Sequence, residues 1–475
     1  MAISESANAA QQRAFESFLQ ACPEYTRTEA LDELRRRDFA RLDRMQHVYL
    51  DYTGGGLYAE SQIDRHMELL RNAVLGNPHS SNPTSKGTTD LVEKARQHIL
   101  EFFRASADEY GVIFTANASQ ALKLVGESYP FEPGDQFLLT FDNHNSVNGI
   151  REFDRAHGAN TTYIPVSPPD MRVDPGVIDT YFALADPERH NLFAYPAQSN
   201  FSGVQHPLEW IERAQAKGWD VLLDAAAFVP TNYLDLGRYK PEYVALSFYK
   251  MFGYPTGLGA LIARWPALEK LHRPWFAGGT IEVASVQADR HYLATGSAAF
   301  EDGTLDYANI PAIDLGLSFI ESVGLDTINL RVKCLCRWLM ESLLALRHAN
   351  GRPLIQLYGP STELDRGGTV TLNFYDARNM VIDHVHIEEA ANRELISLRT
   401  GCFCNPGAGE MALGLSKQEL DTCFSSSDRE MTYDSFRLCI DGKSTGAVRA
   451  SVGIVSNFAD VYRFVEFAKQ FLETS

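Results

Sequence analysis

A lysine at the end of an apolar segment is the first residue in this sequence whose position suggests chemistry. Lys250 follows the strand-like run "VALSFY", and the glycine-rich segment "GYPTGLG" begins three residues later. A partly desolvated lysine has a lowered pKa, and its neutral amine is a nucleophile that forms Schiff bases with aldehydes. A solvated surface lysine is the ordinary alternative, so the residues at neighbouring strand ends must decide between the two.

Three further strand-like segments are followed by groups that complement an amine. Asp224 follows "DVLL", His144 lies after "QFLLT", and Ala118 and Ser119 begin a predicted helix after "GVIFT". At the end of a buried strand, the carboxylate of Asp224 needs a cationic partner, and the imidazole of His144 can stack on a flat ring. The helix N-terminus at Ala118 and Ser119 can bind phosphate. Each has an ordinary alternative, such as an ion pair, a local hydrogen bond or a helix cap. Together with Lys250 they match the needs of pyridoxal phosphate, which are an amine, a phosphate cradle, a ring support and a partner for the pyridine nitrogen.

The glycines after Lys250 also resemble the start of a dinucleotide-binding fingerprint. Gly257 and Gly259 are followed by the strand-like run "ALIAR", with no third glycine and no helix. The fingerprint requires both, so the sequence argues against a dinucleotide.

These groups must be positioned by alternating strands and helices in the middle of the chain. Near-continuous apolar strands separated by helices predict an α/β fold, with a mostly parallel seven-stranded sheet between helices. In such a sheet, ligands bind beyond the carboxyl ends of the strands. The seven predicted strands span 111–115, 136–140, 161–166, 191–197, 220–226, 243–248 and 259–264.

After about residue 305 the pattern changes to long helices followed by separate strands, which predicts a smaller α+β domain. We expect an N-terminal helical segment (1–40) packing on that small domain, a large ligand-binding domain (41–305) and the small domain itself (306–475). The polar segment 423–434 is expected to be a surface loop.

Composition limits the classes of partner. The formal net charge is −18 with no basic run, so nucleic acid and anionic membranes are unlikely to attract this chain. No segment approaches the length of a membrane span, and the N-terminus lacks the features of a secretory signal. Seven cysteines, an odd number, do not suggest a disulfide framework, so we expect a cytoplasmic protein in a reducing compartment.

Two motifs identify a family resemblance. The segments "SFYKMFGYPTGLGALIAR" (247–264) and "LRTGCFCNPGA" (398–408) resemble the lysine and cysteine motifs of the class V, fold-type I pyridoxal-phosphate enzymes, the cysteine desulfurases and their relatives. The similarity is greatest to the N-terminal desulfurase domain of molybdenum cofactor sulfurases. Further matches run in family order over nearly the whole chain: "VYLDYTGGGLY" (48–58), "GNPHS" (76–80), "FTANAS" (114–119), "NHNSV" (143–147), "LLDAA" (222–226) and "STGAVRASVG" (444–453).

The resemblance implies a role for each matching residue. Lys250 would hold pyridoxal 5′-phosphate, Asp224 would keep the pyridine nitrogen protonated, and His144 would stack on the ring. Further cofactor contacts are implied for Ala118, Ser119, Asn200, Ser247 and Tyr249. Substrate contacts are implied for Arg449, Arg399, Asn200 and Thr53. Thr304 resembles a threonine that reaches the phosphate of a neighbouring subunit, which implies a homodimer with its active site at the interface.

Cys404 aligns with the desulfurase nucleophile, although a free cysteine is more often a small buried apolar residue. Its glycine- and proline-bounded loop suits a thiol that must reach a site. Cys402, two residues away, could instead pair with it or help to bind metal, but no second cysteine pair completes a zinc site. Cys334 and Cys336, on a predicted helix, are expected to be core or surface residues. No metal site is expected.

The sequence therefore predicts a stand-alone enzyme that takes sulfur from L-cysteine, or a close analogue, as a persulfide on Cys404 and releases alanine. A separate protein could accept that sulfur. The alternative is a cysteine or cystine C–S lyase, or another class V reaction, on the same scaffold. Departures from the family pattern keep the alternative open: Ala227 stands where a glutamine is usual, Tyr249 where a histidine is usual, and no counterpart of the sulfurase C-terminal domain is present.

Overall fold

The computed structural model describes residues 5–78, 80–426, 439 and 446–473. The α-helices are α1 (Glu5–Ala21), α2 (Ala30–Asp38), α3 (Arg41–Arg44), α4 (Glu60–Asn72), α5 (Pro83–Phe102), α6 (Ala118–Ser128), α7 (Asn145–Asn148), α8 (Arg151–Ala156), α9 (Ile178–Phe182), α10 (Trp210–Gln215), α11 (Phe248–Phe252), α12 (Trp265–Lys270), α13 (Pro311–Val323), α14 (Leu325–Leu344), α15 (His384–Arg393), α16 (Pro406–Leu413), α17 (Lys417–Ser426) and α19 (Phe458–Lys469). Two 3-10 helices are η1 (Pro23–Thr28) and η2 (Gly296–Phe300). The strands are β1 (Val48–Tyr49), β2 (Tyr110–Thr115), β3 (Gln136–Thr140), β4 (Asn160–Ile164), β5 (Asn191–Pro196), β6 (Asp220–Asp224), β7 (Tyr243–Ser247), β8 (Gly259–Arg264), β9 (Ile281–Ser285), β10 (Arg290–Leu293), β11 (Ile355–Tyr358), β12 (Thr369–Phe374), β13 (Ile396–Ser397), β14 (Arg399–Gly401) and β15 (Ala447–Ser451).

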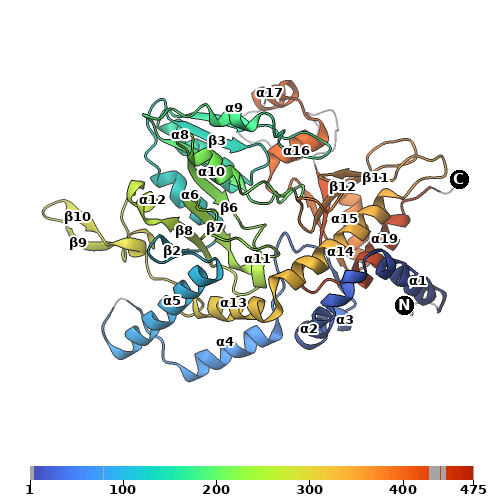
Figure 1. Ribbon diagram of the computed structural model, residues 1–475, viewed down its shortest axis with the longest axis horizontal. Helices are drawn as coiled ribbons and strands as arrows, with labels where there is room; N and C mark the ends of the chain where they lie inside the picture. The colour runs from blue at the N-terminus through green and yellow to red at the C-terminus, as the bar shows by residue number, and fades with distance from the viewer. Residues whose placement is uncertain (1–4, 79, 427–438, 440–445, 474–475) are drawn as a thin grey trace.

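A seven-stranded sheet forms the centre of the large domain, in the order β2-β8-β7-β6-β5-β3-β4. Strand β8 runs antiparallel to β2 and β7, and all other pairs are parallel. Side chains of β7 alternate between two hydrophobic clusters, Val244 and Leu246 in one and Tyr243 and Ala245 in the other. Both faces of the sheet are therefore covered, as Figure 1 shows, and the predicted α/β architecture is confirmed.

The small sheet contains four strands in the order β11-β12-β15-β14, all antiparallel. Helix α14 packs against β11 and β12, and α15 against β14 and β15. The short strand β1 pairs in parallel with β13, and Asp51 forms a bridge with Ser451 of β15. A segment that precedes the large sheet in sequence is thus attached to the small sheet.

The N-terminal segment contacts α14 and α19 of the small domain (Figure 1). Arg331 of α14 is fully buried and makes two hydrogen bonds to Asp32, at 2.8 and 2.7 Å. Arg35 of α2 pairs in the same way with Asp460 of α19. Buried guanidinium groups require such anionic partners because their desolvation is costly, so these pairs fix where the segment lies.

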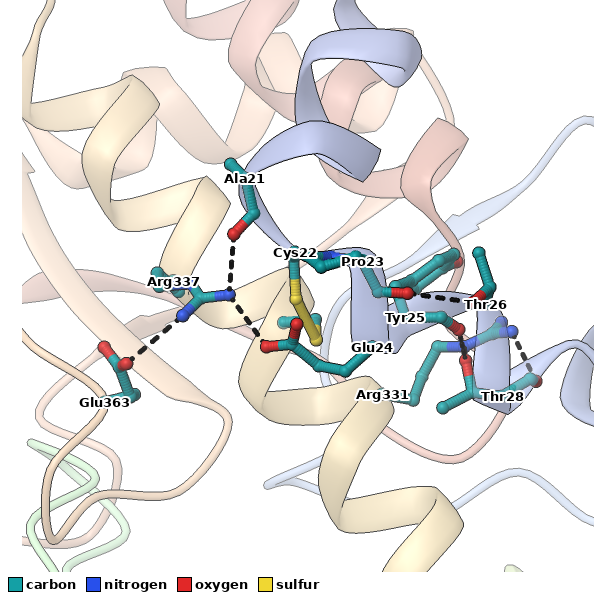
Figure 2. Close-up of a disulfide and its surroundings, with 11 residues drawn as sticks. Ala21, Cys22, Pro23, Glu24, Tyr25, Thr26, Thr28, Arg331, Arg337 and Glu363 are labelled. Atoms are coloured by element: carbon teal, nitrogen blue, oxygen red, sulfur yellow. Dashed lines mark hydrogen bonds and ion pairs between the residues drawn. A yellow bond between two sulfur atoms is a disulfide. The ribbon is translucent and has the colours of Figure 1, made fainter.

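Four of the seven cysteines form disulfides, Cys22–Cys334 and Cys423–Cys439. Figure 2 shows the first, beside Arg337, which bonds to both Glu24 and Glu363. The expectation of no disulfide framework was therefore wrong. Cys22 and Cys334 are 312 residues apart, and only the packing of the N-terminal segment on α14 brings them together.

Smaller differences concern the ends of elements. The predicted strands at 161–166 and 243–248 are observed as β4 (Asn160–Ile164) and β7 (Tyr243–Ser247). Residues 423–426 belong to α17, whereas the rest of the expected loop 423–434 lies outside the described residues. Among the helices that the structure describes, none is long and apolar enough to cross a membrane.

The disulfides predict the thiol count of the purified protein. Denatured without reductant, the chain should present three reactive thiols, those of Cys336, Cys402 and Cys404, and seven after reduction. Titration with a thiol-specific chromogenic reagent measures both numbers. Seven thiols before reduction, in protein purified without reductant, would contradict the pairing.

Candidate functional site

A cavity of about 370 Å³ lies at the carboxyl ends of the central strands. It collects residues from the ends of β2, β3, β5, β6 and β7, although these lie far apart in the sequence. Eight predicted site residues line it: Ala118, Ser119, His144, Asn200, Asp224, Ser247, Tyr249 and Lys250. The parallel arrangement of the strands is the reason, because their carboxyl ends meet at one edge of the sheet.

Lys250 lies in the helical turn α11 directly after β7. That turn ends at Gly253, which has φ of +79° and whose Cβ, if present, would lie 2.2 Å from the backbone of Leu57. Among the described residues, Lys250 has no hydrogen-bond or ion-pair partner. Burial lowers the pKa of its ammonium group and the nearby Arg449 lowers it further, whereas the charge of Asp224 raises it. The lowered pKa increases the fraction of neutral amine, which is the form that a Schiff-base lysine requires.

Asp224 ends β6 and is 9% exposed. Its Oδ1 accepts a hydrogen bond from the Ala226 backbone N–H at 3.0 Å, and no cation within the described part of the chain forms an ion pair with it. A buried carboxylate without a cation is costly. The position therefore fits a protonated ring nitrogen inside the cavity.

His144 is the N-cap of α7, and its Nδ1 accepts a hydrogen bond from the Ser146 backbone N–H at 3.1 Å. Burial lowers the pKa of the imidazole, and the nearby Lys250 and Arg449 act in the same direction, opposed by Asp224. The ring is therefore held in one orientation and kept neutral, which suits contact with a flat ring.

The start of α6 supplies the anion-binding end of the cavity. Asn117 caps the helix by accepting a hydrogen bond from the Gln120 N–H, and Ser119 Oγ lies 2.6 Å from Ser146 Oγ. A Cβ on Gly259 would lie 2.5 Å from the Asn117 backbone, so a glycine is needed where β8 passes this turn. Exposed N–H groups and hydroxyls at a helix N-terminus suit a phosphate group.

The loop that carries Cys404 is fastened to this cavity. Asn200 Nδ2 donates to the Phe403 carbonyl at 2.8 Å, Asn405 Nδ2 donates to Asn200 Oδ1 at 2.9 Å, and the Asn145 N–H donates to the Cys404 carbonyl at 2.7 Å. Phe403 and Cys404 both have φ of +56°, and the Cys404 side chain is exposed. The backbone of the loop is therefore held by residues of the cavity, while the Cys404 thiol itself is exposed and near enough for its charge to act on Lys250. Both ends of the Asn200 amide are used in this way, which the sequence did not indicate.

Cys402 is also exposed, whereas Cys336 is buried in α14, where its thiol donates to the Gly367 carbonyl. Burial raises the pKa of the Cys336 thiol, so it remains protonated. The two exposed thiols are thus both on the loop beside the cavity.

The two predicted carboxylate-binding arginines are brought together on β14 and β15. Arg449 is 3% exposed and donates from Nη1 to the Asn200 carbonyl at 2.9 Å. Arg399 lies opposite it and is more exposed. Both are bonded to Asp51. Sequence reasoning missed Asp51, although a carboxylate directly after an apolar strand and before three glycines was the available signal.

The remaining two predicted residues lie beside the cavity rather than in it. Thr53 lines a small adjoining space of about 30 Å³ together with Ala227 and Lys250. Thr304 is exposed and lines a neighbouring pocket of about 430 Å³, which shares its border residues Ala116 and Gly257 with the Lys250 cavity. Within this chain, Thr304 therefore lies outside the Lys250 cavity, in a pocket that Gln120 of the first turn of α6 also lines.

Comparison with known proteins gives results consistent with this geometry. The family model described as aminotransferase class-V matches residues 48–464. The molybdenum cofactor sulfurase of Arabidopsis thaliana is 37% identical over 92% of this chain and 57% of its own length, and that of Homo sapiens is 37% identical over 92% and 51%. The chain thus spans about half the length of these curated relatives. A cysteine desulfurase from Thermococcus onnurineus NA1 has the same fold, with a TM-score of 0.75 and 21% identity over 93% of this chain and 98% of its own.

The electrostatics of the cavity predict how Lys250 reacts in cofactor-free protein. Because burial lowers its pKa, an amine-selective acylating reagent should label Lys250 at lower pH than it labels an ordinary lysine. In Asp224→Asn, the labelling should move to still lower pH, because a charge that raises the pKa is removed. Mass spectrometry of digests across a pH series measures the shift, with exposed Lys217 as internal reference. A shift to higher pH in Asp224→Asn would contradict the assignment.

Proposed function

The chain belongs to the aminotransferase class-V family, and its relatives are enzymes that use pyridoxal 5′-phosphate as cofactor. We propose that it removes sulfur from L-cysteine or a close analogue. The sulfur would be held as a persulfide on Cys404, with alanine as the other product. The observation that carries the proposal is the attachment of the Cys404 loop to the cavity through Asn200.

The cavity offers a partner for each part of the cofactor. The Lys250 amine, with its lowered pKa, suits the aldehyde, and Asp224, which has no ion-pair partner among the described residues, suits the pyridine nitrogen. His144 suits the ring face, and the start of α6 suits the phosphate. When bound, the cofactor supplies an electron sink that stabilises a carbanion at the α-carbon of an amino acid.

Side chains of the protein would then remove the α-proton, bind the substrate carboxylate and accept the sulfur. Lys250 would serve as the base that removes the proton from the α-carbon of the amino acid. Arg449 and Arg399 hold the substrate carboxylate by charge-assisted hydrogen bonds. The thiolate of Cys404 attacks the substrate sulfur, so that the carbon–sulfur bond breaks and a sulfur–sulfur bond forms. Overall, L-cysteine and the Cys404 thiol become L-alanine and the Cys404 persulfide, and no external oxidant is needed.

The alternative is β-elimination by a C–S lyase, which would yield pyruvate and would not need Cys404. The fold serves several chemistries, so it does not exclude that reaction. We favour sulfur transfer because an exposed thiol on a loop tied to the cavity has no part in elimination, and because the curated relatives are named as sulfurases.

The product and its dependence on Cys404 test this proposal. Wild-type enzyme incubated with L-cysteine should form alanine, and Cys404→Ser should lower that rate by about a hundredfold or more, as expected for loss of a covalent nucleophile. Chromatography of amino acids and a pyruvate assay identify the products. Cys402→Ser, on the same loop, is the matched control and should retain the rate within about threefold.

Two outcomes would reject sulfur transfer. Pyruvate as the main product of the wild-type enzyme indicates elimination. Unchanged alanine formation in Cys404→Ser would show that the persulfide is not formed on that residue.

We also propose a homodimer that passes its sulfur to a separate acceptor protein. The location of Thr304 supports the dimer, because this residue lies outside the Lys250 cavity of its own chain, in a pocket at the border of that cavity. Exposed Trp275, on the border of the same neighbouring pocket, offers apolar surface for a second copy.

The dimer has a simple test. Light scattering should give about twice the chain mass of 53.0 kDa. The Thr304→Ala variant should bind the cofactor about tenfold more weakly, because a hydrogen bond to an anionic group is lost. Cofactor affinity is measured by fluorescence titration, and Thr422→Ala, an exposed threonine on α17, should leave it unchanged. A monomeric chain that binds the cofactor normally would contradict the dimer.

A further inference from the structure

The carboxylate of Asp51 bridges two guanidinium groups. Its Oδ1 accepts a hydrogen bond from Arg449 Nη2 at 3.0 Å, and its Oδ2 accepts bonds from Nε and Nη2 of Arg399 at 3.1 and 2.7 Å. The side chain of Asp51 is largely buried, at 11% exposure. Charge-assisted bonds of this kind hold a guanidinium group in a defined plane.

The strand register places two positive charges close together, and the Asp51 carboxylate offsets their repulsion. Arg399 and Arg449 are directly opposite each other in the antiparallel pair β14 and β15, and like charges in such positions repel. Burial lowers the pKa of Arg449, whereas the charge of Asp51 raises it. Among the residues that the structure describes, Asp51 is the one carboxylate paired with both guanidinium groups, so it offsets their repulsion but leaves one of the two positive charges without a counter-ion.

The backbone around Asp51 is arranged to fix its carboxylate. The N–H groups of Gly54 and Gly55 donate to the Asp51 carbonyl at 3.0 and 3.1 Å, and Asp51 is bridged to Ser451 of β15. A Cβ on Gly54 would lie 2.5 Å from Asp51 Oδ2. Glycine at position 54 therefore leaves the space that the carboxylate occupies.

A buried donor remains free on the inner arginine. Arg449 Nε has no hydrogen-bond partner among the described residues, although it is fully buried. The same guanidinium donates from Nη1 to the carbonyl of Asn200, a residue of the Lys250 cavity, and lies 4.7 Å from the centre of the Phe403 ring. An unsatisfied buried donor beside one uncompensated positive charge points to an anionic ligand.

We propose that Asp51 is a positioning residue, which orients Arg449 and Arg399 so that they bind one further carboxylate, the α-carboxylate of the substrate. This inference rests on the proposed function only in so far as the ligand of the Lys250 cavity is an amino acid. Asp51 would thereby give the enzyme its preference for amino acids over simple amines. The residue acts through the arginines and does not touch the reacting atoms.

Two ligands without sulfur isolate the effect of the carboxylate. L-alanine and ethylamine differ only in that group, and their binding to the cofactor-loaded enzyme is followed by the change in its visible absorbance. Wild type should bind L-alanine at least about tenfold more tightly than ethylamine. In Asp51→Asn, the affinity for L-alanine should fall by about tenfold or more, while that for ethylamine stays within about twofold.

A second variant moves the carboxylate without removing its charge. Gly54→Ala should displace the Asp51 side chain and lower the affinity for L-alanine in the same selective way. Asp32→Asn is the matched control, since Asp32 also bonds twice to a buried arginine, Arg331, outside the site. It should change neither affinity.

Three results would overturn the inference: no preference for L-alanine in the wild type, equal losses for both ligands in Asp51→Asn, or unaltered L-alanine binding in Asp51→Asn or Gly54→Ala. If Asp51→Asn fails to fold, Gly54→Ala alone decides. Failure of the sulfur chemistry is distinguishable, because it shows as missing alanine from L-cysteine while the two binding constants still differ.

Discussion

A single carboxylate placed between two guanidinium groups connects the parts of the chain that form this site. Asp51 follows β1, while its partners Arg399 and Arg449 lie 348 and 398 residues later on the small sheet. Arg449 in turn bonds to Asn200, which lines the cavity at the edge of the large sheet. The buried positive charge is tolerated only with its counter-ion in place, so the two sheets and the N-terminal strand must assemble together before the site is complete.

Desolvation sets the chemistry of the remaining groups. Burial lowers the pKa of both Lys250 and His144, and the positive charge of Arg449 acts on both in the same direction. Asp224 opposes this shift on each of them. The cavity thus favours the neutral forms of an amine and an imidazole, close to a carboxylate that has no ion-pair partner among the described residues. The protein as a whole is strongly acidic, so this balance belongs to the local arrangement and not to the overall charge.

The loop of Cys404 distinguishes this protein from a bare cofactor-binding scaffold. Its backbone is held by Asn145, Asn200 and Asn405, and the Phe403 ring lies against the guanidinium of Arg449. The thiol-bearing loop and the buried guanidinium of Arg449 therefore share one contact residue, Asn200. Asn200 thus couples the position of the Arg449 guanidinium to that of the thiol-bearing loop. Such contacts matter because a fold by itself does not specify the reaction.

The sequence by itself determined the seven-stranded sheet, and its strand ends together with the family resemblance predicted eight of the residues that line the cavity. Apolar strand-length segments define the strands, and parallel strands bring their carboxyl ends to one edge whatever their separation in sequence. Only the tertiary structure decided the partners of Asp51 and the pairing of Cys22 with Cys334. It also decided that Asn200 serves the cysteine loop and that Thr304 lies outside the cavity. These depend on contacts between segments hundreds of residues apart, which no local pattern of polarity or spacing encodes.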